Sequence, residues 1–119
     1  MILIVDDKPE NIFSLKTILE LHSFPTDTAL SGEEALKKIL RQSYALIILD
    51  VQMPGMDGFE ATKIIREEEK AKGLPRLTII AMTAHALLGD KERCLVAGMD
   101  DYISKPFQPK ELKEKLGVA

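Results

Sequence analysis

The sequence contains one cysteine and no tryptophan, and aromatic residues fill only 5% of its 119 positions. The single Cys94 excludes an internal disulfide and any zinc site built from several thiolates. We expect Cys94 to be a small buried residue, because a free cysteine packs like an apolar side chain. Since aromatic side chains are scarce, aliphatic residues must fill the core, and the 45% hydrophobic share is enough for one.

An excess of basic charge is also lacking, as are long apolar runs. Sixteen Lys and Arg residues stand against 19 Asp and Glu, for a net charge of -3. A protein that binds nucleic acid directly needs a basic face, so we expect no such partner. Every apolar run is far shorter than the ~20 residues of a membrane span. No cleavage site follows the first run, so we expect no membrane insertion and a cytoplasmic location.

We find no internal repeat, low-complexity tract or linker, so we expect residues 1–119 to form one domain. Short apolar runs alternate with segments of helical periodicity. The predicted strands are Ile2–Val5, Pro25–Leu30, Ala45–Leu49, Leu77–Met82 and Asp101–Ile103. The predicted helices are Glu10–Leu21, Glu33–Arg41, Phe59–Lys72, Leu88–Ala97 and Lys110–Leu116.

This alternation predicts an α/β fold with a parallel sheet covered on both faces. Five units indicate a flavodoxin-like (βα)5 three-layer sandwich, for which the strand order 2-1-3-4-5 is known. Ser31 and Glu34 have the spacing of a capping box at the start of the second helix. Gly73 and Gly98 each follow a helix, at a position where glycine tolerates positive φ. In such a fold, ligands bind beyond the carboxyl ends of the strands.

Polar residues follow four of the predicted strands: Asp6 and Asp7, Asp50, Thr83, and Lys105. Their side chains should meet at one edge of the sheet. Two carboxylates 4 Å apart repel by ~4 kcal/mol at an effective dielectric near 20, so three need protons or a cation. Oxygen ligands with few protein contacts are typical of Mg²⁺. A carboxylate beside such a cation and a lysine can act as a nucleophile toward phosphorus.

Asp50 is the favoured nucleophile, because it ends the central strand and precedes a turn-rich loop at residues 53–58. The neighbouring pair Asp6 and Asp7 is better placed for metal binding. Each residue also has a simpler interpretation. The aspartate pair could be a solvated turn, Thr83 a β-forming residue at a strand end, and Lys105 a surface lysine before proline.

Four stretches carry a family resemblance: Ile2–Asp7, Leu49–Gly58, Ala81–Ala84 and Gly98–Phe107. In this order and spacing they resemble response-regulator receiver domains over essentially the whole chain. The later stretches are most similar to receivers attached to hybrid sensor histidine kinases. The resemblance implies that Asp50 accepts a phosphoryl group from a phosphohistidine on a sensor histidine kinase or a phosphotransfer domain.

The resemblance also implies the roles of the remaining site residues. Mg²⁺ (or Mn²⁺) would be surrounded by Asp6, Asp7, Asp50 and the backbone carbonyl of Gln52. Lys105 would contact the phosphoryl oxygens. Thr83 would move toward the phosphoryl group, and Tyr102 would swing inward behind it, although Tyr102 is equally interpreted as a half-buried strand residue. His85, like Gln52, occupies a position that tunes dephosphorylation in this family.

A receiver of this kind modifies itself and does not turn over as an enzyme. The face of the fourth helix, fifth strand and fifth helix would carry the output and could support a weak dimer. The last predicted helix has only Leu112 and Leu116 as anchors, which indicates either a domain cut from a longer protein or a weakened output face.

Three alternatives stay open. A Mg²⁺-dependent phosphohydrolase of the haloacid-dehalogenase type would want Asp-x-Asp after the first strand, where this chain has Asp6 and Asp7. A flavodoxin would need a phosphate loop that these acidic residues oppose. A degenerate receiver used only for protein interaction would not need all five site residues.

Overall fold

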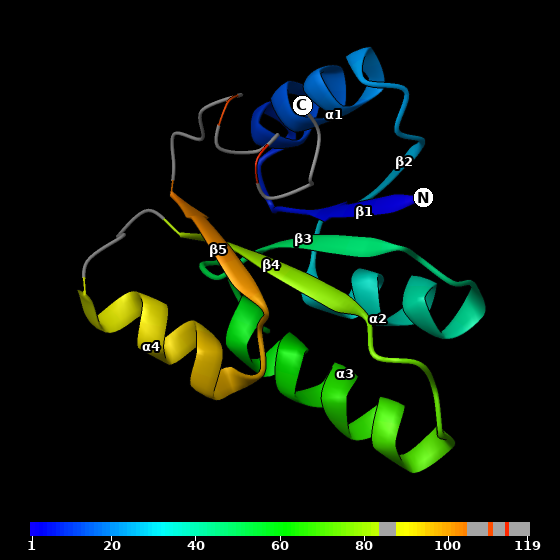
Figure 1. Cartoon of the computed structure of the whole chain (residues 1–119), viewed down its shortest axis with the longest axis vertical. Coiled ribbons are helices and arrows are strands. Elements are labelled where there is room, and N and C mark those ends of the chain that lie inside the picture. Colours follow the sequence, from blue (N-terminus) through cyan, green and yellow to red (C-terminus); the bar gives the residue numbers. More distant parts are fainter. Residues whose placement is uncertain (84–87, 105–109, 111–113, 115–119) are drawn as a thin grey trace.

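The computed structural model describes residues 1–83, 88–104, 110 and 114. Within this part of the chain, five strands and four helices alternate (Figure 1). The predicted helix at Lys110–Leu116 lies almost entirely outside the described residues. In chain order the elements are β1 Ile2–Val5, α1 Pro9–Leu21, β2 Thr26–Ala29, α2 Gly32–Arg41, β3 Leu46–Asp50, α3 Gly58–Lys72, β4 Thr78–Thr83, α4 Leu88–Ala97 and β5 Asp101–Ser104.

The strands form one parallel sheet in the order β2-β1-β3-β4-β5, which confirms the prediction. The chain leaves β1 toward β2 on one side and returns to β3 on the other, so the order reverses between β1 and β3. At this switch point Val5 pairs with Leu49. The residues that follow them in the chain are therefore brought to the same edge of the sheet, where such folds bind ligands.

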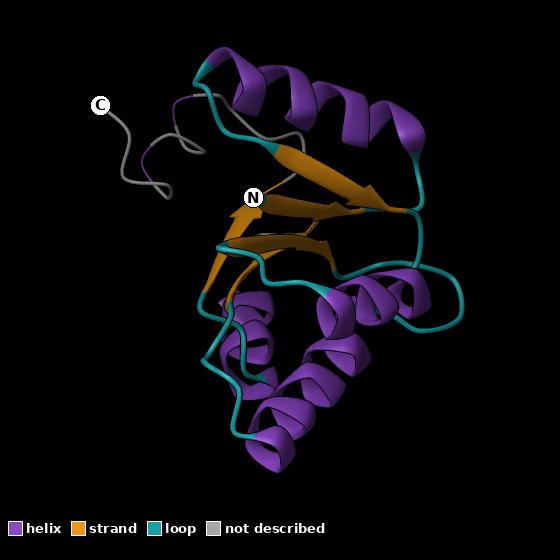
Figure 2. Ribbon diagram, turned by 90° about the vertical axis from the view of Figure 1, so that its right-hand side faces the viewer, coloured by secondary structure: helices purple, strands orange, loops and turns teal. Residues whose placement is uncertain are grey.

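Helices cover both faces of the sheet, so the molecule has the three predicted layers (Figure 2). Alternate strand residues point to opposite faces, and they enter two separate hydrophobic clusters. Leu15 of α1 packs in one cluster. Ala35 of α2, Ile65 of α3 and Cys94 of α4 pack in the other, which confirms that Cys94 is buried. No described helix is both long enough and apolar enough to cross a membrane.

Two of the helices begin at side-chain caps. Ser31 Oγ accepts a hydrogen bond of 3.1 Å from the Glu34 N–H, and Asp57 Oδ1 accepts one of 2.9 Å from the Glu60 N–H. Each cap satisfies an N–H group that has no partner within the first turn. The capping box at α2 is half confirmed, because Glu34 Oε1 accepts from the N–H of Leu30 at 2.9 Å, one residue before the expected donor.

Arg66 of α3 connects the amino end of β4 to the turn between α4 and β5. Its Nε donates to the carbonyl oxygen of Gly98 at 2.9 Å, and its Nη2 donates to Asp100 at 2.9 Å. Its Nη1 donates to Glu69 at 2.9 Å and to the carbonyl oxygen of Leu77 at 2.8 Å. Gly98 has φ +104, and a Cβ there would lie 3.1 Å from Arg66 Cγ, so glycine suits both the backbone and the contact.

The outer strand β2 carries a polar cluster, which explains its weak apolar pattern. The Tyr44 hydroxyl donates to Asp27 Oδ2 at 2.7 Å, and Lys38 Nζ donates to Asp27 Oδ1 at 3.1 Å. The bond from Tyr44, with those from the Thr28 N–H and Lys38, lowers the pKa of Asp27 against the opposing effect of burial. Burial and the hydrogen bond to Asp27 raise the pKa of Tyr44 to about 12.

Candidate functional site

Asp6, Asp7 and Asp50 converge at the carboxyl edge of the sheet, as the sequence predicted. One carboxylate oxygen from each residue lies within 4.8 Å of the other two. Asp6 and Asp50 are almost fully buried, and Asp7 is partly exposed. Two of the three come from the end of β1 and one from the end of β3, so the switch point of the sheet assembles the cluster.

Asp6 is held by two neighbours on the segment that follows it. The Lys8 N–H donates to its Oδ1 at 2.9 Å, and the side-chain amide of Asn11 donates to its Oδ2 at 3.0 Å. Asn11 was not predicted as a site residue. The available signal was its spacing, because the first turn of the helix after β1 brings an amide back over the carboxylate five residues earlier.

Asp50 is fixed by its own strand and by the loop that follows. It is the last residue of β3 and pairs with Met82 of β4, and its Oδ1 accepts a hydrogen bond of 3.0 Å from the Gln52 N–H. The start of α3 packs closely against this segment. A Cβ on Gly58 would lie 2.5 Å from the carbonyl oxygen of Asp50 and 2.7 Å from the Cα of Val51, so only glycine fits there.

The donor set fits a hard divalent cation. Within the described part of the chain, Oδ1 of Asp7 is buried and has no hydrogen-bond partner. A buried carboxylate oxygen without a partner is costly unless a cation or proton compensates it. Three carboxylates at this spacing supply oxygen ligands and excess negative charge, which suits Mg²⁺ better than a transition metal that prefers nitrogen or sulfur.

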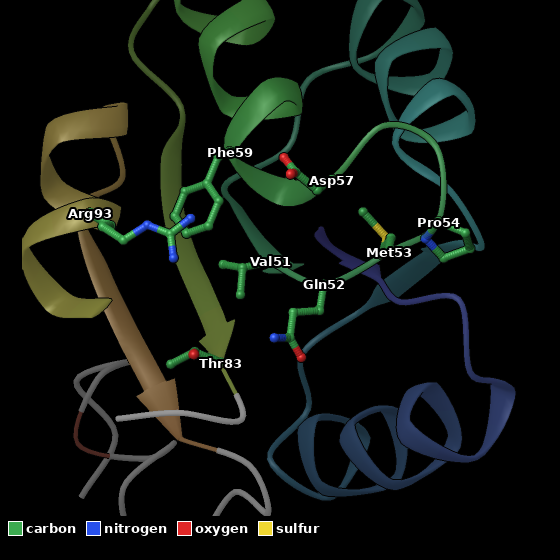
Figure 3. Close-up of a pocket in the computed structure, with 8 residues that line it drawn as sticks. All are labelled: Val51, Gln52, Met53, Pro54, Asp57, Phe59, Thr83 and Arg93. Atoms are coloured by element: carbon green, nitrogen blue, oxygen red, sulfur yellow. The ribbon is translucent and has the colours of Figure 1, made fainter. Parts of the chain in front are cut away.

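Thr83 lies at the same carboxyl edge of the sheet and lines a cavity of about 420 Å³ (Figure 3). It ends β4, where it pairs with Ser104, and its side chain is buried. Gln52, Phe59 and Arg93 line the same cavity. Phe59 and Arg93 were not predicted as site residues. Their contact joins α3 to α4, and no local sequence pattern indicates such a contact.

Tyr102 is half-buried in β5 and packs against the cluster that faces α2, α3 and α4. It pairs with Ala81, two residues before Thr83 on β4, so both side chains belong to the same face of the sheet. The switch roles of Thr83 and Tyr102 stay predictions. Lys105 and His85 lie outside the described residues.

A profile of the response regulator receiver domain matches residues 2–117 of the chain. The chain belongs to this family. It is a receiver domain of two-component signalling, and this class contains signalling modules rather than classical enzymes.

The curated relatives include hybrid kinases, as the later motifs indicated. Hybrid signal transduction histidine kinase L of Dictyostelium discoideum is 47% identical over 116 residues, which are 95% of this chain and 7% of that protein. Sensor protein GacS of Pseudomonas syringae pv. syringae is 38% identical over 113 residues, which are 95% of this chain and 12% of that protein. The receiver domain thus spans only a small part of the length of these relatives.

Solved structures include close matches to the receiver domain. One is the receiver domain of sensor histidine kinase PA1611 from Pseudomonas aeruginosa PAO1, with a magnesium ion coordinated in its active site cleft. It has a TM-score of 0.84 and 40% identity, covering 97% of this chain and 92% of that chain. The receiver domain of Ssk1 from Saccharomyces cerevisiae, crystallised with the phosphotransfer protein Ypd1, gives a TM-score of 0.91 and 33% identity, covering 96% and 83%.

Proposed function

We propose that Asp50 is the phosphoryl acceptor of this receiver domain. The observation that carries the proposal is the convergence of Asp6, Asp7 and Asp50 at the switch point of the sheet. Asp50 alone among the three ends the central strand, and the Gln52 N–H orients its carboxylate. A nucleophile held by a rigid strand keeps the geometry that attack on phosphorus requires.

Asp6, Asp7 and Asp50 would hold the divalent cation, which we propose to be Mg²⁺, and the backbone carbonyl of Gln52 would be a further ligand. The cation would offset the negative charge of the phosphoryl oxygens. Asn11 supports this site from behind, because its bond to Asp6 limits the rotation of that carboxylate.

The transfer of the phosphoryl group would be a substitution at phosphorus. A bond forms between a carboxylate oxygen of Asp50 and phosphorus as the bond from phosphorus to the donor's imidazole nitrogen breaks. The electron pair of the broken bond stays on that nitrogen. Lys105 would contact the phosphoryl oxygens, as the family resemblance implies. The domain would thereby catalyse its own phosphorylation. Attack of water on phosphorus would then break the bond to Asp50, restore its carboxylate and release inorganic phosphate.

Thr83 and Tyr102 would then report the modification. Thr83 is buried at the acceptor edge, and Tyr102 packs on the same face of the sheet. A phosphoryl group adds negative charge and acceptor oxygens, which favours a conformation in which the Thr83 hydroxyl donates to it. The output face of α4, β5 and the last predicted helix would respond, and a weak dimer through that face stays a prediction.

The donor would be a phosphohistidine on a sensor histidine kinase or a phosphotransfer domain. The relation to receivers of hybrid kinases supports this partner, as does the likeness to the Ssk1 receiver crystallised with Ypd1. We also propose that the domain lies on the cytoplasmic side, as expected from the sequence. The family assignment leaves the phosphohydrolase and flavodoxin alternatives without support.

Incubation with acetyl phosphate, with and without Mg²⁺, followed by intact mass measurement, tests the proposal. We expect one base-labile phosphoryl adduct on the wild type in the presence of Mg²⁺ and none on Asp50→Asn. Asp57→Asn is the matched control, because Asp57 lies in the same loop and asparagine also caps a helix. Absence of the adduct on the wild type, or its persistence on Asp50→Asn, would contradict the assignment.

A further inference from the structure

Arg93 and Phe59 form the wall between two hollows on the α3–α4 side of the molecule. The inner hollow is the cavity of about 420 Å³ that Gln52 and Thr83 also line. The outer hollow, of about 530 Å³, is a groove between α3 and α4. The residues common to both are Asp57, Phe59 and Arg93. A side chain of α4 is therefore part of the cavity beside the acceptor.

The Phe59 ring positions the Arg93 guanidinium. The guanidinium carbon lies 4.7 Å from the ring centroid, which is within the range of a cation–π contact. Figure 3 shows Arg93 reaching from α4 across the ring toward the cavity. Arg93 is exposed, and an exposed arginine normally samples many rotamers. Stacking on Phe59 reduces that freedom and keeps the charge at the cavity wall.

The charge matters because the acceptor edge is strongly acidic. Asp6, Asp7 and Asp50 lie together there, and Asp57 lines the cavity. Every phosphoryl donor is an anion, so this edge repels it on approach. A concave site concentrates the field of the charges that line it, and a fixed cation raises the local concentration of an anionic ligand. An arginine carries its positive charge throughout the physiological pH range.

We propose that Arg93 is a positioning residue that draws the anionic phosphodonor toward Asp50 through the cavity that Gln52 and Thr83 line, and that it favours donors of higher negative charge. The inference rests on the proposed acceptor role of Asp50. Arg93 acts on the approach and binding of the donor and leaves the bond exchange at phosphorus to the residues around Asp50. Phe59 serves the same role indirectly, by holding the guanidinium in place.

The test compares two small donors at saturating Mg²⁺ and neutral pH. Acetyl phosphate is mainly a dianion there, and phosphoramidate is mainly a monoanion. Removing one positive charge lowers the rate constant by a certain factor. For a Coulombic attraction, that factor is squared when the charge of the donor doubles. We expect Arg93→Met to lower the apparent second-order rate constant ~3-fold for phosphoramidate and ~10-fold for acetyl phosphate. Arg93→Lys should retain most of both rates.

Two further readouts separate this role from a structural one. Arg93→Met should raise the donor concentration that gives the half-maximal rate and leave the rate at saturating donor unchanged. The loss should also shrink as ionic strength rises, because salt screens the attraction. Lys63→Met is the charge-matched control, because it removes one positive charge from the exposed face of α3, away from both hollows. Its rates should equal those of the wild type.

Three outcomes would overturn the proposal: unchanged rates in Arg93→Met, equal losses for the two donors, or a loss that salt does not reduce. Phe59→Leu provides an independent variant, and we expect a smaller loss with the same dependence on donor charge. Thermal unfolding confirms that each variant is folded. Absence of any adduct on the wild type would instead contradict the acceptor assignment, so the two failures are distinct.

Discussion

The side-chain amide of Asn11 donates a hydrogen bond of 3.0 Å to Oδ2 of Asp6, across the first turn of α1. This bond orients a carboxylate of the proposed cation site. Loss of such a supporting bond typically weakens metal binding 10- to 100-fold. We expect Asn11→Ala to raise the dissociation constant for Mg²⁺ by ~10-fold, measured by isothermal titration calorimetry.

Ser14→Ala controls for this change, because Ser14 lies on the same helix and donates only to the Glu10 carbonyl oxygen at 3.1 Å. Its Mg²⁺ affinity should match that of the wild type. Equal affinity in Asn11→Ala and the wild type would show that Asp6 does not depend on the amide.

The acidic cluster should destabilise the domain when no divalent cation is present. Asp7→Asn removes one of three crowded charges, so we expect its free energy of unfolding in EDTA to exceed that of the wild type by ~1 kcal/mol. Added Mg²⁺ should stabilise the wild type much more than this variant, because ligand binding stabilises only the state that binds it. Urea denaturation measures both effects.

Glu67→Gln is the matched control for Asp7→Asn, because it neutralises an exposed carboxylate on α3 outside the cluster. Its stability should change little in either buffer. A loss of stability in Asp7→Asn without Mg²⁺ would argue that the cluster carries protons or internal partners in place of unrelieved repulsion.

The contact of Gly58 with the end of β3 predicts a costly substitution. A Cβ at Gly58 would meet backbone atoms of Asp50 and Val51 at 2.5 and 2.7 Å, so the segment that bears Asp50 must shift. We expect Gly58→Ala to lower the free energy of unfolding by ~2 kcal/mol, as overpacking of a close contact does, measured by urea denaturation.

Gly32→Ala is an informative comparison, because Gly32 is the first residue of α2 as Gly58 is of α3. The nearest atoms to its added Cβ are two of the flexible Met56 side chain at 3.1 Å and the Met56 carbonyl oxygen at 3.2 Å, all farther away than the backbone atoms near Gly58. We expect a cost below ~1 kcal/mol, since the side chain can move aside and the backbone oxygen needs to shift by only a few tenths of an ångström. Equal costs at the two glycines would contradict the role given to the Asp50 backbone.

The cluster on β2 predicts a loss of stability at high pH. The pKa of Tyr44 is raised to about 12 in the folded protein, whereas an unfolded tyrosine titrates near ~10. A raised pKa means that the stabilisation is complete below the unfolded value and is lost as pH rises through the folded value. The stability advantage of the wild type over Tyr44→Phe should therefore decline between pH ~10 and ~12.

Chemical denaturation of both proteins across that pH range measures this advantage, and ultraviolet absorbance follows the tyrosinate directly. Comparison with Tyr44→Phe cancels the titration of the lysines, which both proteins share. A constant difference across the range would mean that the bond between Tyr44 and Asp27 contributes nothing to folding.

The alternation of strands and helices and the acidic residues at the strand ends follow from local patterns in the sequence, whereas the strand order came from the known fold class. Ile2–Val5 is buried on both faces, as a continuous apolar run predicts for a parallel strand. The ends of β3 and β4 each lie one residue beyond the prediction, at Asp50 and Thr83. The apolar pattern shows only which side chains avoid water. Backbone pairing can continue through a polar residue, because its N–H and carbonyl groups still face the neighbouring strand.

What the sequence could not predict depends on contacts between distant segments. Phe59 and Arg93 meet only because α3 and α4 lie on the same face of the sheet. Likewise, Arg66 bonds to Asp100 across the turn that precedes β5. Neither pair has a spacing that local periodicity reveals, so both contacts are evident only in the folded structure.

The bonds of Arg66 hold one end of α4 against α3 and leave the other end outside these bonds. The Gly98 carbonyl and Asp100, in the turn after the helix, bond to Arg66 of α3. The carboxyl end of α4 would therefore stay in place if the helix tilted. A helix of 10 residues is about 15 Å long, so a tilt of ~10° displaces its other end by about 2.5 Å. That other end is Leu88, so the greatest displacement falls at the start of α4 and the smallest at the turn that precedes β5.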